Sequence, residues 1–407
     1  MLSFEQLMVL SNVRVIDCTT ATGGPVAAAY LGDLGAEVIK VEQRGKGDMV
    51  RGLQQILGVP VQLHGRHIVV EHQDRNKKSI ELDLNKQKAK GILYKLVEKS
   101  DVFITNFIPN AVKRLEMDYE TLMKHNPKII YCATNMFGLQ GPDTNTPGFD
   151  LLSQARSGLM ASSGEEGPPV MVTIGIGDHI QAVLCAFGIL AALLARDKHG
   201  IGQKVEVSQL GGLVTTLCSS MWNQVLFMNQ FQKRQNRNNA GNPLYNWYQC
   251  KDGKWIALTC HYEKYWGNLC KALGMPELEH DPRFETIEDK MANNKELIEI
   301  LDSVFLTKTS KEWETSLREA GALFSVVNTF QDLATDSQVI ANNYMLEVDH
   351  PIFGKARFPG FPVRLSRTPM TFRSIAPELG QDTEEILLNI GGYNWDEITK
   401  LKDEEVI

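Results

Sequence analysis

The sequence predicts an α/β protein in which an open parallel sheet forms a large domain and a smaller α+β domain follows. Between Val13 and Thr134, short apolar runs typical of strands alternate with helical patterns, and this order implies parallel pairing. Polar, Asn-rich sequence at Gln232–Asn242 then interrupts the pattern, as at a domain boundary. Beyond it, Lys251-Asp252-Gly253 predicts a hairpin turn between two strands. The first part is therefore expected to be Rossmann-like and the later part α+β.

The first β-α-β unit shows the pattern most clearly. Val13–Cys18 is a short apolar run and predicts a strand. Pro25 suits the first turn of a helix, and the small residues Val26–Leu34 follow it. Glu37–Glu42 alternates apolar and polar residues, which predicts the next strand.

The same alternation continues to residue 208 and beyond. Strands are expected at Ser79–Leu84, Asp101–Thr105, Lys128–Thr134 and Lys204–Ser208. Helices are expected at Lys86–Ser100, Tyr119–His125, Phe149–Leu159, Asp178–Arg196 and Gln209–Gln230. The later part predicts helices at Tyr262–Leu273, Asn294–Phe305 and Lys311–Ala320, a Pro/Gly-broken β region at Pro351–Leu365 and a helical tail at Asp382–Lys402.

Composition narrows the functional classes. The formal net charge of −7 argues against general nucleic-acid binding, which needs a concentrated positive surface. The seven cysteines are dispersed without zinc spacing, so we expect no metal site, and reduced thiols in a cytoplasm. The N-terminal residues do not show the pattern of a secretory signal. The most apolar stretch, Ala182–Ala195, has about 14 residues where a bilayer needs about 20, which predicts a buried helix and no membrane partner.

Asp178 is the first candidate for chemistry. It follows Gly175-Ile176-Gly177 and precedes the most apolar helical pattern. One interpretation is a helix N-cap, a position that favours Asp. The other is a nucleophile, because a helix N-terminus is expected to hold a carboxylate ionised and glycines let a bulky ligand approach. Spacing alone leaves both interpretations open. The neighbouring His179 is expected to have a local packing or hydrogen-bonding role.

Two other features point to anionic ligands, each with a simpler alternative. The turn Thr22-Gly23-Gly24-Pro25, followed by Glu42, resembles a dinucleotide-binding turn, but it lacks G-x-G-x-x-G and favours a tight strand-to-helix turn. Basic residues cluster at Arg75–Lys78 and at Lys113-Arg114. Such clusters bind phosphates at strand ends or simply form a solvated face.

In order and spacing, the motifs of the whole chain resemble those of the family III CoA-transferases. The matching segments are VIDCTTATGGP, LGDLGAEVIKVE, RNKKSIELDL, DVFITNFIPNAVKRL, NPKIIYCATNMFGLQGP, GFDLLSQARSG, IGIGDH and GIGQKVEVS. The resemblance implies a homodimer of two interlocked chains. It implies a large Rossmann-like CoA-binding domain from residues 1–208 and 345–407, a linker helix at 209–235 and a small α+β domain at 236–344.

The resemblance also implies that Asp178 is the nucleophile and that acyl-CoA and a carboxylic acid are the substrates, with no cofactor besides CoA. A mixed aspartyl anhydride and an aspartyl-CoA thioester would form in turn, and backbone N–H groups near Gly177 and Asp178 would stabilise the oxyanions. The expected CoA-binding residues are Ala21, Thr22, Gln43, Arg44, Leu82, Asp83, Leu84, Asn85, Asn106, Phe107, Ile108, Arg114, Asn135 and Phe137.

Departures from formyl-CoA transferase bear on the substrate. Thr22 replaces a Gln of its active site, Gln43 a CoA-binding Arg and Asn135 a Lys that helps to bind CoA. Its glycine-rich lid is reduced here to Asn239-Ala240-Gly241-Asn242-Pro243. Asp178-His179 and the run from Asn236-Arg237-Asn238 to Asn242-Pro243 are more similar to the 2-hydroxyacyl, phenyllactate-type members.

Three alternatives remain. An α-methylacyl-CoA racemase of the same family pairs its aspartate with a His in a G-H-D motif, whereas this chain has Gly148-Phe149-Asp150. An NAD-dependent oxidoreductase would need the glycine pattern that the first turn lacks. A non-catalytic CoA-binding protein would show no covalent modification of Asp178.

Overall fold

The computed structural model describes residues 7–217, 225, 227–229, 234–361 and 363–407. Contacts divide the chain into two compact units. Unit 1 comprises Met1–Met160, Met171–Gln230 and Asn343–Ile407, and unit 2 comprises Ala161–Val170 and Phe231–Asn342. Residues 161–170 are predicted in the large domain, but their contacts lie in unit 2.

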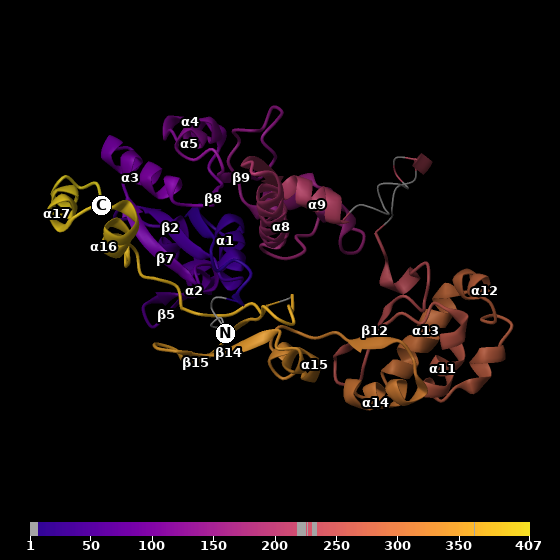
Figure 1. The fold of residues 1–407 in the computed structure, drawn as a ribbon. Helices are drawn as coiled ribbons and strands as arrows, with labels where there is room; N and C mark the ends of the chain where they lie inside the picture. Colours follow the sequence, from indigo (N-terminus) through magenta and orange to yellow (C-terminus); the bar gives the residue numbers. More distant parts are fainter. Residues whose placement is uncertain (1–6, 218–224, 226, 230–233, 362) are drawn as a thin grey trace. The chain divides into compact units, whose positions relative to one another are not determined.

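Unit 1 contains a six-stranded parallel sheet, as the sequence predicts (Figure 1). In spatial order its strands are β10 (Gln203–Ser208), β9 (Ile130–Asn135), β8 (Val102–Thr105), β1 (Arg14–Cys18), β2 (Glu37–Gln43) and β7 (Lys77–Leu82). Strand order reverses beside β1, which pairs with β2 on one side and β8 on the other. Ligands of open α/β sheets bind at such a reversal, beyond the carboxyl ends of the strands.

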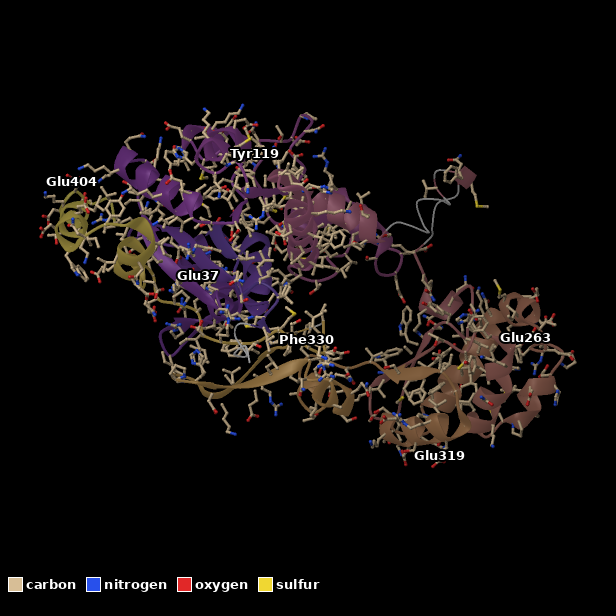
Figure 2. The ribbon with its side chains drawn as sticks, in the orientation of Figure 1. Glu37, Tyr119, Glu263, Glu319, Phe330 and Glu404 are labelled. Atoms are coloured by element: carbon tan, nitrogen blue, oxygen red, sulfur yellow. The ribbon has the colours of Figure 1, made fainter. Side chains whose placement is uncertain are left out.

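Helices cover both faces of this sheet. On one face, α1 (Gly23–Asp33) packs against α8 (Ile176–His199) in a core that includes Val26, Ala182 and Ile189. On the other face, the core joins α3 (Gln87–Glu98), α5 (Tyr119–His125) and the C-terminal α16 (Thr383–Ile386) and α17 (Trp395–Asp403). Tyr119 begins α5, and its ring lies 5.7 Å from that of Tyr131 on β9 (Figure 2). The tail therefore completes the core of unit 1.

Several helix boundaries differ from the prediction, and glycines explain two of the differences. The predicted helix Phe149–Leu159 is split into α6 (Asp150–Arg156) and α7 (Leu159–Ser162) at Gly158, whose φ is +86°. The predicted tail helix is interrupted before α17 at Gly392, whose φ is +71°. Both lie in the left-handed region, which glycine adopts at no steric cost.

Two predicted helices change in extent. α1 begins at Gly23, so Pro25 is its third residue and not its first. α9 begins at Gln209 as predicted and is described to Leu217. Much of the remaining predicted linker, to residue 235, lies outside the described residues.

α8 is longer than the apolar stretch that predicts it. Among the described residues it is the one helix long and apolar enough to cross a membrane by length and composition, with 24 residues. One side packs into the core of unit 1, while Val183, Phe187 and Leu194 are exposed. The expected burial therefore holds for one face of this helix only.

Unit 2 is an α+β body. The hairpin predicted at Lys251–Gly253 joins β11 (Trp247–Gln249) to β12 (Trp255–Leu258), and β12 also pairs with β13 (Phe324–Val326). Helices around its core are α11 (Glu263–Leu273), α12 (Ile287–Ala292), α13 (Asn294–Phe305) and α14 (Ser310–Ala320).

The other described helices and strands are short. In unit 1 they are β3 (Gln55–Ile56), β4 (Val59–Pro60), β5 (Gln62–Leu63), β6 (Arg66–His67), α2 (Ile68–Gln73), α4 (Pro109–Arg114), β14 (Met345–His350) and β15 (Gly354–Pro359). In unit 2, α15 spans Ser337–Ala341. β14 and β15 form the β region that the sequence predicts slightly later, at Pro351–Leu365.

Candidate active site

Two adjoining cavities open at the carboxyl end of the parallel sheet in unit 1. The larger has a volume of about 600 Å³ and the smaller about 350 Å³. Thr20, Met49, Phe107 and Ala111 line both. Because they share these residues, the two cavities form one site. We call the smaller one the inner cavity.

The larger cavity collects half of the expected CoA contacts. Those that line it are Gln43, Leu82, Asp83, Leu84, Asn85, Phe107 and Arg114. Lys46 also lines it, although the sequence analysis does not single it out. Within the described part of the chain, neither Lys46 nor Arg114 forms an ion pair with a carboxylate. Both cations are therefore available to phosphate groups.

The smaller cavity brings together most of the other expected contacts and the candidate nucleophile. Its lining includes Ala21, Thr22, Asn106, Phe107, Ile108, Asn135 and Asp178. Asp178 is the one ionisable side chain among the described residues of this lining. The inner cavity is thus a largely uncharged chamber with a single carboxyl group.

Arg44 and Phe137 line neither cavity, which differs from the expectation. Nε of Arg44 donates to the backbone oxygen of Ile407 at 2.8 Å, because the C-terminus packs beside the end of β2. The guanidinium of Arg156 lies 4.9 Å from the ring centroid of Phe137. Both side chains are therefore engaged elsewhere in unit 1.

Asp178 lies in the first turn of α8, and its carboxylate accepts a hydrogen bond from a neighbouring helix. Nε2 of Gln209 donates to Oδ1 of Asp178 at 2.6 Å. The backbone of Gly23 also lies close, since a Cβ added there would be 3.3 Å from Oδ1 of Asp178. Burial and then the nearby charge of Asp150 raise the pKa of Asp178 to about 7, which outweighs the hydrogen bond from Gln209. Asp178 is therefore only partly ionised near neutral pH, whereas the sequence predicts that the helix end holds it ionised.

Asp150 explains why the helix end does not stabilise Asp178. Oδ1 of Asp150 accepts the backbone N–H groups of Gly177 at 2.6 Å and of Asp178 at 3.3 Å. Its Oδ2 accepts the N–H of Gly175 at 3.0 Å. A buried carboxylate thus occupies the positive end of α8. The N–H groups of Gly177 and Asp178 are therefore not free to stabilise an oxyanion, contrary to the expectation.

His179 lies outside both cavity linings. Its ring centroid is 6.0 Å from that of His72. Burial lowers the pKa of His179 and lowers that of His72 to about 3. This pair of uncharged rings agrees with the local packing role that the sequence analysis expects.

The turn after β1 forms one wall of the inner cavity. Asn106, which follows β8, makes two hydrogen bonds to the backbone of Thr20. Nδ2 of Asn106 donates to the Thr20 oxygen at 2.6 Å, and Oδ1 accepts the Thr20 N–H at 3.0 Å. Ala21 has φ of +66°, which is uncommon for a residue with a Cβ. Its N–H donates to Oδ1 of Asp48 at 3.1 Å. Two polar side chains from other elements therefore hold this turn in its conformation.

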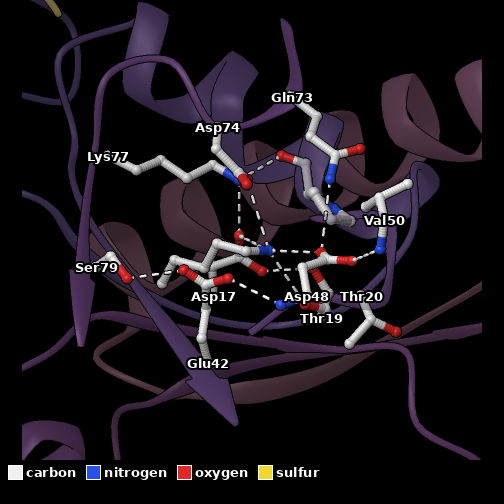
Figure 3. Close-up of polar contacts among 12 residues, drawn as sticks. Asp17, Thr19, Thr20, Glu42, Asp48, Val50, Gln73, Asp74, Lys77 and Ser79 are labelled. Carbon is white, nitrogen blue, oxygen red and sulfur yellow. Dashed lines mark hydrogen bonds and ion pairs between the residues drawn. The ribbon is translucent and has the colours of Figure 1, made fainter. Parts of the chain in front are cut away.

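A buried ionic network lies beneath the turn (Figure 3). Nζ of Lys40 lies 3.0 Å from Asp48, 3.5 Å from Asp74 and 3.9 Å from Asp17. Nζ of Lys77 lies 2.7 Å from Asp17 and 2.8 Å from Asp74. All five side chains are fully buried. Burial alone lowers the pKa of Lys40, but Asp74, Asp48 and Asp17 together raise it well above its usual value. Lys40 therefore stays protonated, and its ion pair holds Asp48 against the turn.

The partners of Asp178 cannot be recognised in the sequence. Gln209 is predicted only as the start of a helix, and Asp150 only as part of Gly148-Phe149-Asp150. Asp48, which holds the turn at Ala21, belongs to no motif with a predicted role. No sequence pattern connects these residues to Asp178, since each lies on a different element. Among the described residues, no group of His, Cys, Asp and Glu has the arrangement of a metal site.

Comparisons with known proteins agree with this geometry. The sequence model described as CoA-transferase family III matches residues 10–383. The chain is 31% identical over 398 residues to a succinyl-CoA:glutarate CoA-transferase of Mus musculus, covering 98% of this chain and 90% of that protein. It is 30% identical over 414 residues to an (R)-2-hydroxy-4-methylpentanoate CoA-transferase of Clostridioides difficile, covering 98% and 100%. A solved CAIB/BAIF family protein from Brucella suis matches with a TM-score of 0.84 at 25% identity, covering 94% and 99%.

Proposed function

Because this chain belongs to CoA-transferase family III, and is therefore a transferase that uses CoA thioesters, we propose that it transfers CoA between carboxylic acids through Asp178. The observation that carries the proposal is the position of Asp178. It is the one ionisable group among the described residues of the inner cavity, which adjoins the larger cavity where the expected CoA contacts gather.

In the proposed reaction, the carboxylate of Asp178 attacks the thioester carbon of the donor. A mixed anhydride forms and CoA thiolate leaves. The thiolate remains bound and attacks the aspartyl carbon, which releases the donor acid and leaves an aspartyl-CoA thioester. The acceptor carboxylate then enters and the steps run in reverse. Covalent catalysis of this kind divides one difficult exchange into easier steps.

The inner cavity favours transfer over racemisation. A racemase needs two groups that exchange protons with the α-carbon. Phe149 lines the inner cavity and has no exchangeable proton, and Asp178 has no second ionisable partner among the described lining residues. Exchange of the α-proton with deuterium in the absence of an acceptor acid would support racemisation instead.

The acceptor is proposed at the level of a class. One relative is named for glutarate and another for a 2-hydroxy acid, at nearly equal identity. We propose a 2-hydroxy or related carboxylic acid and would test it against a dicarboxylic acid. A panel of acids with acetyl-, succinyl- and cinnamoyl-CoA, analysed by mass spectrometry, measures which pairs exchange CoA. Exchange with glutarate but with no 2-hydroxy acid would contradict this part.

The central experiment replaces Asp178. Asp178→Ala and Asp178→Asn are expected to abolish CoA exchange, and hydroxylamine after acyl-CoA addition is expected to modify only the wild type at Asp178. Asp197→Asn, at the exposed far end of the same helix, is the matched control and should keep wild-type exchange. Near-wild-type exchange by a folded Asp178 variant would refute the mechanism.

We also propose that two chains associate, interlocked as the family resemblance implies. The exposed apolar residues Val183, Phe187 and Leu194 of α8 support an interface, because large apolar side chains exposed on one helix are typical of interaction surfaces. Light scattering should give twice the chain mass. Interlocked chains should remain dimeric on dilution, whereas a simple dimer would dissociate. A monomer at all concentrations would refute the proposal.

The proposed location is a cytoplasm. Six of the seven cysteines lie among the described residues, and all six are free and buried. Reduced thiols are typical of that compartment. Fractionation of the native cells, followed by immunoblotting, would test the location.

A further inference from the structure

We propose that the carboxamide of Gln209 is the oxyanion-stabilising donor for the steps in which the carbonyl carbon of Asp178 is attacked. The inference rests on the proposed function, since it concerns the anhydride and the thioester on Asp178. Gln209 lies outside the family motifs of the sequence, so no motif assigns it this role.

The position of Gln209 follows from the sheet. Gln209 comes directly after β10, whose last residue, Ser208, is paired with Asn135 at the end of β9. The N–H of Leu210 donates to the backbone oxygen of Met136 at 2.9 Å, which fixes the start of α9 at this edge. Gln209 is 6% exposed and lines the inner cavity. A buried amide on an anchored backbone is the kind of donor that needs little reorganisation during a reaction.

The orientation of the Gln209 amide favours a role towards Asp178. Nε2 lies 2.6 Å from Oδ1 of Asp178, while Oε1 is buried with no hydrogen-bond partner in the described part of the chain. A Cβ added to Gly177 would lie 3.4 Å from Oε1, so this oxygen faces an α-carbon and not a donor. An unpaired buried oxygen costs free energy. If the amide were reversed, Oε1 of Gln209 would face the carboxylate of Asp178. The observed orientation instead directs the N–H donor of Gln209 towards that carboxylate.

The backbone of Gly23 also lies close to Oδ1. A Cβ at this position would lie 3.3 Å from Oδ1 of Asp178. Oδ1 is the oxygen that Gln209 holds, and Oδ2 is the oxygen that we assign as the nucleophile.

The chemistry places charge on the held oxygen. Oδ2 of Asp178 attacks the donor thioester, so in the anhydride Oδ2 bridges the two acyl carbons and Oδ1 is the aspartyl carbonyl oxygen. CoA thiolate then attacks the aspartyl carbon, a C–S bond forms and the carbonyl electron pair moves onto Oδ1. Collapse of this tetrahedral intermediate breaks the bond from the aspartyl carbon to Oδ2, and the donor acid leaves with Oδ2. The amide of Gln209 stabilises the charge on Oδ1.

A purely structural role for Gln209 predicts something different. A donor that only favours the ionised form of Asp178 lowers its pKa, and its loss is compensated when the pH is high enough to ionise Asp178 in any variant. A donor to the oxyanion acts after ionisation. Its loss therefore persists at pH values well above 7.

The experiment measures single-turnover incorporation of radiolabelled CoA into the protein. The donor is whichever of acetyl-, succinyl- or cinnamoyl-CoA supports exchange, labelled in the CoA part. Wild type, Gln209→Leu and Gln209→Asn are compared across pH. Gln203→Leu, at the other end of β10, is the matched control. Gln209→Asn keeps an amide but withdraws it by one methylene, and it serves if Gln209→Leu does not fold.

Gln209→Leu is expected to form the labelled thioester about 10²- to 10³-fold more slowly, with the deficit unchanged at high pH and little change in KM for acyl-CoA. Gln209→Asn should be intermediate, and Gln203→Leu should match the wild type. If wild type forms the thioester and the Gln209 variants match it, or recover fully at high pH, the oxyanion role is refuted and the proposed function stands. If wild type forms no thioester under conditions of transfer, the proposed function fails and this inference with it.

Discussion

Oδ1 of Asp150 accepts the backbone N–H of Asp178 at 3.3 Å, so two carboxylates meet at the same helix end. One of them, Asp150, takes the N–H groups of α8. The other, Asp178, faces the inner cavity. The pKa of Asp178 rises to about 7 through burial and through the charge of Asp150. The candidate nucleophile is therefore tuned by its neighbour, and this has consequences for activity and stability.

The rate of CoA exchange should increase with pH through about 7 and then level off. Only the ionised carboxylate is a nucleophile, and half of Asp178 is protonated at a pH equal to its pKa of about 7. The measurement is kcat/KM against pH for any active donor and acceptor pair. A profile that is flat from pH 5 to 9 would contradict the raised pKa.

Asp150→Asn should move the acidic limb of that profile to lower pH. The variant removes a negative charge beside Asp178 and keeps an oxygen that can accept the N–H of Gly177. Weaker capping should also lower the melting temperature. If the limb stays in place while the protein remains folded, the charge of Asp150 does not control Asp178.

Asp178→Asn should stabilise the protein at high pH. The pKa of Asp178 is raised on folding, so its favourable contribution is present below about pH 4 and is lost as the pH rises through about 7. A neutral amide avoids that loss, which is on the order of 2 to 4 kcal/mol. Urea unfolding at pH 8 should show the gain, and unfolding at pH 4 should show almost none. Equal effects at both pH values would point to another cause.

Lys40→Met should destabilise unit 1 strongly. Lys40 pairs with Asp48, Asp74 and Asp17 in a site without water-exposed side chains. Removing one partner of a buried ionic group costs about 3–5 kcal/mol. Lys88→Met is the control, because the Lys88–Glu404 pair is exposed and should contribute under about 1 kcal/mol. Similar losses in urea unfolding for both variants would contradict the importance of the network.

Arg114→Ala should raise KM for acyl-CoA by about tenfold, which corresponds to one lost charged contact, with kcat nearly unchanged. Arg114 lines the larger cavity. Arg44→Ala is the informative comparison, because Arg44 binds the C-terminus and lines neither cavity. A larger effect for Arg44 than for Arg114 would favour the expectation from sequence over the observed placement.

Gly23→Ala should reduce activity while acyl-CoA still binds. The added Cβ would lie 2.3 Å from Oε1 of Gln181 and 3.3 Å from Oδ1 of Asp178, so the wall of the inner cavity must shift. Gly91→Ala is the control. Gly91 lies in α3, and a Cβ added there would meet nothing within 4 Å. Gly91→Ala should instead stabilise by about 0.5–1 kcal/mol. Unchanged turnover of Gly23→Ala would show that the wall is more adaptable than the contacts suggest.

The parallel sheet and its strands could be predicted because periodicity is local. Val13–Cys18 and Glu37–Glu42 carry their patterns within six residues each, and the structure places strands there. The boundaries of α1 and the break at Gly158 could not be predicted as well. Helix boundaries depend on capping contacts and on backbone conformations that more than one sequence can adopt. The sequence alone therefore does not define them to the residue.

The sequence by itself determined the family, the parallel sheet and Asp178 as the candidate nucleophile. Motif order and apolar periodicity are properties of the sequence and do not depend on which distant residues meet in the fold. Only the tertiary structure decided the state of Asp178. Asp150 lies 28 residues from it and Gln209 lies 31, on separate elements that meet at the carboxyl end of the sheet. Charge repulsion, burial and hydrogen bonding act through space, so their balance at Asp178 appears only when the chain has folded.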